Sequence, residues 1–104
     1  MIARVWAARA TASNAPLYAE HLRDQVIPAL RRVDGYRGAR LLQRKDGVEV
    51  EIIVTTWWDS RDAIRGFAGA DIDLAVVEDE AAALLIGYEA HVQHYDLVLA
   101  DDME

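Results

Sequence analysis

The stretch KDGVEVEIIVTTWW, residues 45–58, constrains the fold more than any other part of the chain. Its Asp-Gly pair is a strong signal for a tight turn between two antiparallel strands. Side chains alternate between the two faces of a strand. One face therefore carries Val48, Val50, Ile52, Val54, Thr56 and Trp58, and the other carries Glu49, Glu51, Ile53, Thr55 and Trp57. Because both faces hold apolar residues and one tryptophan, the strand is predicted to be covered on both sides.

The remaining segments alternate between strand-like and helix-like patterns. Helical spacing predicts one long helix that Ser13 or Asn14 caps, with Pro16 in its first turn. At Pro28 this helix should kink or restart. Its buried stripe is predicted to contain Tyr18, Leu22, Val26, Ala29, Leu30 and Val33. The other predicted elements are a strand at 2–10, strands on both sides of Gly47, a short helix capped by Asp59 or Ser60, a helix at about 80–86 closed by Gly87, and a strand at 89–100.

This order of elements, βαββαβ, predicts an α+β domain of the ferredoxin-like kind. Such a domain has an antiparallel sheet with the helices on one face. The strand after Gly47 also has apolar side chains on the open face, so a second copy of the chain is expected to cover it in a homodimer. Residues 1–104 are expected to form a single domain with an acidic C-terminal tail at about 100–104.

The charge balance limits the partners that the chain can bind. Its 11 basic and 18 acidic side chains give a net charge of -7, which argues against nucleic acid and anionic membranes as partners. No apolar run reaches the ~20 residues of a membrane span, and Arg4 and Arg9 interrupt any signal-like core. Together with the absence of cysteine, these features predict a cytoplasmic protein whose partners are small molecules or other proteins.

Several segments, taken in order, resemble one protein family. They are HLRDQVIPALRRVDGYRGARLLQRKDG at 21–47, WDS at 58–60, FAG at 67–69, AVV at 75–77 and HVQHYDLV at 91–98. Together they resemble the antibiotic biosynthesis monooxygenase family of dimeric α/β-barrel proteins. The resemblance implies a homodimer whose two sheets pack into a barrel, with a pocket between sheet and helices in each protomer. It also implies oxidation of aromatic polyketides or quinols without metal or flavin, or, as in other relatives, degradation of haem.

Oxygenation without a cofactor requires a base that converts the substrate into an electron-rich anion. Histidine suits this role, and His21 and His94 are the candidate catalytic residues. His21 shares a helix face with Tyr18, so both enter a pocket if that face covers the sheet; otherwise His21 is solvated. His94 faces either the pocket or a hydrogen bond at the sheet or dimer interface. His91 points to the opposite side of the strand and is expected to be structural or exposed.

The candidates for binding a small aromatic substrate are Tyr18, Tyr36, Arg40, Trp58 and Phe67. Trp58 matches the family pattern at the strand end and would form a flat wall for an aromatic ring; core or interface packing is its alternative role. Arg40 carries a guanidinium suited to an anionic substrate or an oxyanion, or pairs with a nearby glutamate. Tyr36 is either a hydrogen-bond donor or a core aromatic, and Phe67 is expected to pack under the short helix, where it can bound the pocket.

Haem and metal chemistry are both disfavoured by the sequence. Haem-degrading relatives use a histidine on the second helix and an asparagine on the first strand. Here SRDAIRGFAG at 60–69 has no histidine, and Asn14 follows the first strand. The histidines form no local metal-ligand set, so no metal or other cofactor is expected. Two hypotheses stay open: a cofactor-independent monooxygenase of an aromatic, quinol-like or polyketide molecule, and a non-catalytic dimeric ligand-binding or accessory protein.

Overall fold

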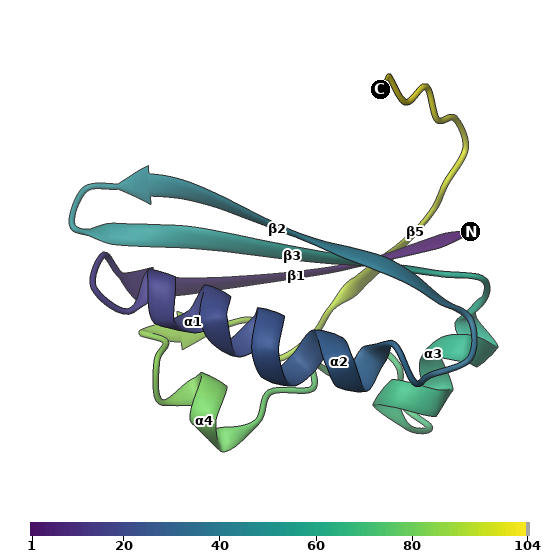
Figure 1. Cartoon of the computed structure of the whole chain (residues 1–104), viewed down its shortest axis with the longest axis horizontal. Coiled ribbons are helices and arrows are strands. Elements are labelled where there is room, and N and C mark those ends of the chain that lie inside the picture. Colours follow the sequence, from purple (N-terminus) through teal and green to yellow (C-terminus); the bar gives the residue numbers. More distant parts are fainter. Residues whose placement is uncertain (104) are drawn as a thin grey trace.

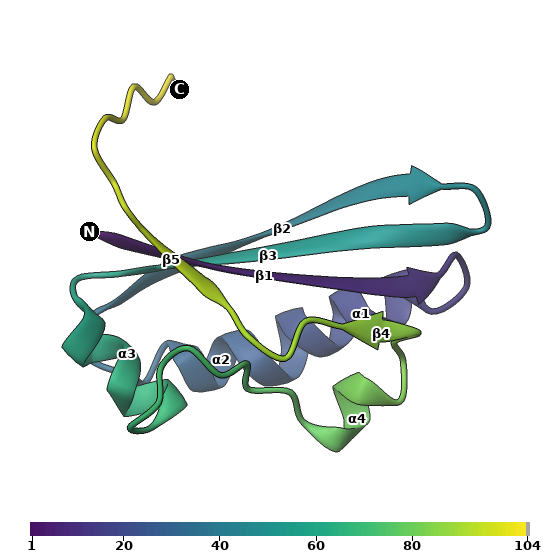
Figure 2. The same ribbon diagram turned by 180° about the vertical axis from the view of Figure 1, so that it is seen from behind.

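The computed structural model describes residues 1–103. It confirms the predicted α+β, ferredoxin-like order, with one sheet in the order β2-β3-β1, and with β4 and β5 both paired to β1. All of these pairs are antiparallel. The helices lie together on one face of the sheet (Figures 1 and 2). The elements are β1 (Ile2–Thr11), α1 (Ala15–His21), the π-helix η1 (Leu22–Val26), α2 (Ile27–Leu30), β2 (Tyr36–Asp46), β3 (Glu49–Trp58), α3 (Arg61–Ala68), α4 (Asp79–Ala82), β4 (Gly87–Tyr88) and β5 (Gln93–Asp96).

The strand β3 follows the predicted alternation from Glu49 to Trp58, whereas Val48, predicted to share the face of Val50, lies in the turn and is exposed. Every second residue, from Val50 to Trp58, is buried against the helices, and the residues between them are half-buried on the other face. The hairpin turn is formed by Gly47 and Val48, because Asp46 and Glu49 still pair across it. Gly47 has a φ of 67°, a left-handed conformation that glycine adopts without steric cost at the first position of a tight hairpin turn.

The first long helix passes Pro28 by means of a π turn. The N–H of Ile27 donates to the carbonyl of Leu22, five residues earlier. The helix therefore widens directly before Pro28, which has no N–H to continue the α-helical hydrogen bonds. The extra residue shifts the helix face by one position. Leu30 is therefore buried, whereas Ala29 is exposed, and its predicted place in the buried stripe is wrong. The other stripe residues are buried or half-buried: Tyr18, Leu22, Val26 and Val33.

Ser60 caps α3 as predicted, since its Oγ accepts a hydrogen bond of 3.1 Å from the N–H of Ala63. Asn14 occupies the N-cap position of α1, but its side chain makes no capping hydrogen bond. The predicted helix at 80–86 is only four residues long, because α4 ends at Ala82. Gly87 does not close it; this residue instead begins β4 and pairs with Arg9 of β1.

The C-terminal part of the chain forms less strand than predicted. Only Gly87–Tyr88 and Gln93–Asp96 pair with β1, and the chain then leaves the sheet on the side opposite the helices (Figures 1 and 2). Of the expected acidic tail at 100–104, Glu104 lies outside the described residues. The sheet of the single chain is open and not closed into a barrel. In the described part of the chain, none of the helices has the length and apolar character needed to cross a membrane.

Candidate functional site

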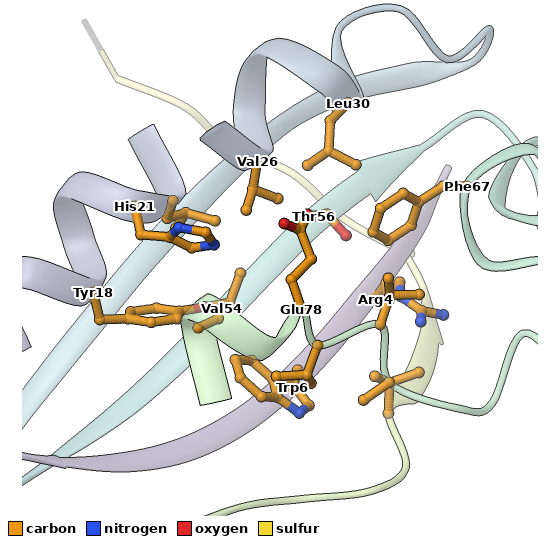
Figure 3. Close-up of a pocket in the computed structure, with 16 residues that line it drawn as sticks. Arg4, Trp6, Tyr18, His21, Val26, Leu30, Val54, Thr56, Phe67 and Glu78 are labelled. Carbon is orange, nitrogen blue, oxygen red and sulfur yellow. The ribbon is translucent and has the colours of Figure 1, made fainter. Parts of the chain in front are cut away.

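A cavity of about 80 Å³ lies between the sheet and the helices. The inward faces of β1 and β3 form its floor, the helix from α1 to α2 forms one wall, and α3 with residues 75–81 forms the others (Figure 3). Most of its lining is apolar, with Trp6, Leu22, Val26, Leu30, Val54 and Phe67 among the contributors. Its polar lining residues are Arg4, Tyr18, His21, Thr56 and Glu78. This composition suits an apolar molecule that a few polar contacts orient.

His21 and Tyr18 stand together on the helix face that covers the sheet. Both side chains are buried and line the cavity, and the His21 ring projects toward its interior (Figure 3). The Nε2 atom of His21 is buried and has no hydrogen-bond partner within residues 1–103. Its other ring nitrogen, Nδ1, lies 3.9 Å from Oε2 of Glu80. A buried ring nitrogen without a partner costs about 1–3 kcal/mol, which a ligand with a matching polar group would recover.

The Tyr18 hydroxyl is a hydrogen-bond donor at neutral pH. Burial raises the pKa of Tyr18 to about 12, because the phenolate form loses its hydration in the apolar surroundings. The Tyr18 ring lies beside the Trp6 indole, with 6.2 Å between ring centroids. Tyr18 therefore offers the cavity both an aromatic wall and one hydroxyl donor.

Phe67 and Thr56 line the cavity, but Trp58 lies behind them in the core. The Trp58 side chain is completely buried and stacks on Phe67 with centroids 6.0 Å apart. Its Nε1 donates a hydrogen bond of 2.8 Å to Oγ1 of Thr56. In this structure Trp58 does not line the cavity and takes its alternative role of core packing: Phe67 and Thr56 separate it from the cavity, and Trp58 supports them.

Arg4 is a buried cation that links β1 to the segment after α3. Its side chain is 4% exposed, and its guanidinium donates to the backbone carbonyls of Ile72 and of Leu74, the latter at 2.8 Å. A third contact joins Nη1 of Arg4 to Nε2 of His94 over 3.1 Å. Because an arginine only donates hydrogen bonds, His94 accepts at Nε2 and carries its proton on Nδ1, which lies 3.5 Å from Oδ1 of Asp73.

His94 is therefore not available as a base in this cavity. It does not belong to the lining residues, and both of its ring nitrogens face protein groups. The expectation of a pocket role for His94 is corrected in favour of the alternative, a hydrogen-bonded histidine at the sheet. His91 is exposed, as expected.

Acidification should destabilise the protein through His94. Burial and the nearby Arg4 guanidinium lower the pKa of His94 below its ordinary value of 6.5, with Arg61 adding to this effect and Asp73 opposing it. The unfolded chain thus binds this proton more readily than the folded chain. The contribution of His94 to the free energy of unfolding is therefore complete above about pH 6.5, and it declines as the pH falls toward the lowered pKa of the folded protein. Urea unfolding at about pH 7.5 and at about pH 5.5 measures the difference in unfolding free energy between the two pH values. His94→Gln should reduce the difference, and a variant of exposed His91 should not; equal differences in all three proteins would contradict this prediction.

Two other sequence candidates lie away from the cavity. Arg40 pairs with Thr55 in the sheet and is exposed on the face opposite the helices, so it cannot reach a ligand between sheet and helices. Tyr36 packs edge-on against Trp58, with 5.4 Å between centroids, and takes the alternative role of a core aromatic. Tyr18, His21 and Phe67 are the predicted residues that the cavity brings together.

Sequence reasoning missed Arg4, Thr56 and Glu78 as lining residues. For Arg4 a signal existed: it occupies an inward position of β1, in alternation with Ile2 and Trp6. A charged residue in such a series is buried and needs polar partners. Glu78 lies in an irregular segment, where no periodic pattern shows the direction of a side chain. No group of three metal-ligating side chains comes together among the residues that the structure describes.

Comparisons with known proteins identify relatives of the sequence and of the fold. The sequence model of the antibiotic biosynthesis monooxygenase family matches residues 1–84. An uncharacterised protein of Mycobacterium tuberculosis, found in two strains, is 34% identical over 80 residues, which are 76% of this chain and 31% of that protein. The chain therefore spans about a third of the length of these curated relatives.

Two solved structures share the fold at low sequence identity. The haem degrader MhuD of Mycobacterium tuberculosis, with two haems bound in its active site, is 19% identical with a TM-score of 0.62, covering 98% of this chain and 100% of MhuD. The monooxygenase ActVA-Orf6 of Streptomyces coelicolor, in complex with nanaomycin D, is 17% identical with a TM-score of 0.63, covering 99% of this chain and 90% of that one. With the family match over most of its length and the shared fold, the chain belongs to the antibiotic biosynthesis monooxygenase family.

Proposed function

We propose that this chain is a cofactor-independent monooxygenase that binds a small aromatic, quinol-like or polyketide molecule in the cavity beneath α1. The observation that carries the proposal is the buried, unpartnered Nε2 of His21, set beside the protonated hydroxyl of Tyr18 in an apolar cavity. A neutral imidazole nitrogen accepts a proton, and a phenol hydroxyl donates a hydrogen bond to the oxygen on which negative charge develops. The aromatic side chains of Trp6 and Phe67 suit a flat ring system.

The chemistry follows from these two groups and dioxygen. For an anthrone-type substrate, His21 removes a proton from the methylene carbon, and Tyr18 stabilises the enolate oxygen. The electron-rich anion reduces dioxygen, which is the oxidant. The methylene carbon loses two hydrogens and gains one oxygen atom as a carbonyl, and the second oxygen atom leaves as one molecule of water. The protein thus supplies the base, the oxyanion donor and a site shielded from solvent.

An aromatic substrate requires the cavity to widen. Its volume of about 80 Å³ is well below the roughly 300–1,000 Å³ of most ligand pockets. The wall at residues 75–81 is the part we propose to move, because it contains only the four-residue helix α4. The N–H of Ala75 donates to the carbonyl of Ala90, and the carbonyl of Glu78 accepts from the N–H of Ala82 in α4. Between them, within the described chain, the N–H groups of Val76 and Val77 donate no backbone hydrogen bonds. Few hydrogen bonds need to break when this wall opens.

The small size of the cavity also favours the second hypothesis, a non-catalytic dimeric ligand-binding or accessory protein. In that case the aromatic side chains pack as core, and His21 serves only to bind a polar group. Haem degradation is not proposed, because α3 contributes Phe67 and no histidine to the site.

Oxygen consumption tests the proposal. Metal-free protein is added to hydroxynaphthoquinols, anthrones and related polyketide phenols, and uptake is compared with the spontaneous rate in buffer. Uptake that rises in proportion to protein concentration supports the oxygenase. Binding of a panel member, measured by calorimetry, without faster uptake supports the ligand-binding protein instead.

We also propose that a second copy covers the open face of the sheet. This face carries exposed Leu42 and half-buried Ile53 and Trp57, and Nε1 of Trp57 is buried with no partner within the described residues. The segment that leaves the sheet on this side adds three exposed apolar residues, Leu97, Val98 and Leu99. Exposed apolar surface of this extent indicates a protein interface.

A charge at the centre of the open face should prevent dimer formation. Ile53 lies between Leu42 and Ala7 in the sheet, so Ile53→Glu would bury a carboxylate in the interface and weaken association at least tenfold, or about 1.4 kcal/mol. Sedimentation equilibrium measures the dissociation constant. Leu17→Glu adds the same charge on the exposed side of α1 and should leave association unchanged. A wild-type protein that sediments as a monomer would contradict the proposal.

A further inference from the structure

We propose that Glu80 is a positioning residue, which holds the proton of neutral His21 on Nδ1 so that Nε2 presents its lone pair to the cavity. The proposal rests on the proposed function for its consequence, since a base needs that lone pair, but the proton's position can be measured without any substrate. It concerns Glu80 because this carboxylate lies within 4 Å of the His21 ring, at 3.9 Å from Nδ1.

The two ring nitrogens of His21 have different surroundings. Nδ1 faces the carboxylate of Glu80, whose side chain is 80% exposed, whereas Nε2 is buried without a partner within residues 1–103. A neutral imidazole carries one proton, on either nitrogen, and an ionised carboxylate only accepts hydrogen bonds. The carboxylate therefore favours the form with the proton on Nδ1, because the opposite form would direct a lone pair at a negative charge.

The other charged or titratable groups at this cavity do not oppose this assignment. Tyr18 stays protonated, since its pKa is raised to about 12, so it adds no negative charge beside the ring. The Arg4 guanidinium is bonded to Ile72, Leu74 and His94. Glu78 lines the cavity as well, but among the described residues it is Glu80, and not Glu78, whose carboxylate lies within 4.0 Å of a His21 ring nitrogen.

The position of Glu80 links the state of His21 to the movable wall. Glu80 is the second residue of α4, and its neighbour Ala81 is buried against the core that contains Tyr18 and Leu22. When this wall moves outward to admit a substrate, the carboxylate leaves His21. In the present position of the wall, a shift of about 1 Å would bring the pair into hydrogen-bond distance. Glu80 thus sets the tautomer of His21 before a substrate enters.

Nitrogen NMR of the histidine side chains tests the proposal in uniformly labelled, substrate-free protein. At about pH 8, above the usual titration range of imidazole, we expect the protonated nitrogen of His21 to be Nδ1 in the wild type. In Glu80→Ala the two tautomers should approach equal populations or reverse, whereas Glu80→Gln, whose amide oxygen can also face the proton on Nδ1 as an acceptor, should retain most of the preference. Asp79→Ala, which removes the neighbouring carboxylate of α4, is the matched control and should resemble the wild type.

The outcomes separate this inference from the proposed function. A wild-type proton on Nε2, an unchanged preference in Glu80→Ala, or an equal change in Asp79→Ala would each overturn the role of Glu80. These results do not depend on turnover. If a panel substrate is consumed, Glu80→Ala should lower kcat about tenfold with little change in KM, a smaller effect than loss of the base itself. A protein that consumes no oxygen but shows the expected tautomers would refute the oxygenase and leave the positioning role intact.

Discussion

Replacing His21 with alanine should lower kcat/KM for oxygen uptake at least about 100-fold, because general bases contribute roughly 10²–10⁴ to rate. The variant keeps the apolar cavity and the Tyr18 donor, but it loses the acceptor nitrogen that is buried beside them. Substrate binding should weaken far less than turnover, since the aromatic contacts of Trp6 and Phe67 stay in place. Initial oxygen-uptake rates at several substrate concentrations separate kcat from KM.

Two control variants make this result interpretable. His91→Ala removes an exposed histidine outside the cavity and should keep wild-type rates. His21→Gln retains a polar side chain of similar size, so it reports on packing without a strong base. Since His21 is buried, thermal unfolding must show that each variant is folded at the assay temperature. A folded His21→Ala protein with wild-type kcat would exclude His21 as the base.

The sheet could be predicted from the sequence because its pattern is local and periodic. The turn at Gly47 and the alternation from Val50 to Trp58 fix which side chains face the helices, and a shift by one residue would expose every buried side chain. The same logic placed Tyr18 and His21 on one helix face. The error at Ala29 came from the π turn before Pro28, which changes the helical period that the prediction assumed.

The rest of the site depends on contacts between segments that are far apart in the chain. Arg4 contacts Leu74 and His94, 70 and 90 residues away, and neither spacing nor composition shows such a pairing. The wall at 75–81 has little regular structure, so no periodicity revealed that Glu78 and Glu80 lie near His21. For Trp58 the alternation showed the correct face, but a face alone does not distinguish a side chain that lines a cavity from one packed behind it.

Replacing Trp58 with alanine should cost about 3–5 kcal/mol of unfolding free energy, the usual range for a fully buried large aromatic. Trp58 is 0% exposed and packs against Tyr36 and Phe67, so its removal leaves a cavity that these rings cannot fill. It also leaves the Thr56 hydroxyl without the indole donor. Urea unfolding monitored by circular dichroism measures the loss. Trp57→Ala, on the open face, should cost less in the monomer, because its side chain is only half-buried.

Trp58→Phe separates a core role from a direct role in the site. Phenylalanine keeps an aromatic ring against Phe67 but removes the hydrogen bond to Thr56, so it should cost about 1–3 kcal/mol and leave a folded protein. Phe67 and Thr56 separate Trp58 from the cavity. Oxygen uptake by this variant should therefore stay within about threefold of the wild type, a change of roughly 0.65 kcal/mol in the activation free energy. A folded Trp58→Phe protein that loses turnover as severely as His21→Ala would show that the indole acts on the substrate directly. The separation of Trp58 from the cavity would then not persist when the wall at 75–81 opens.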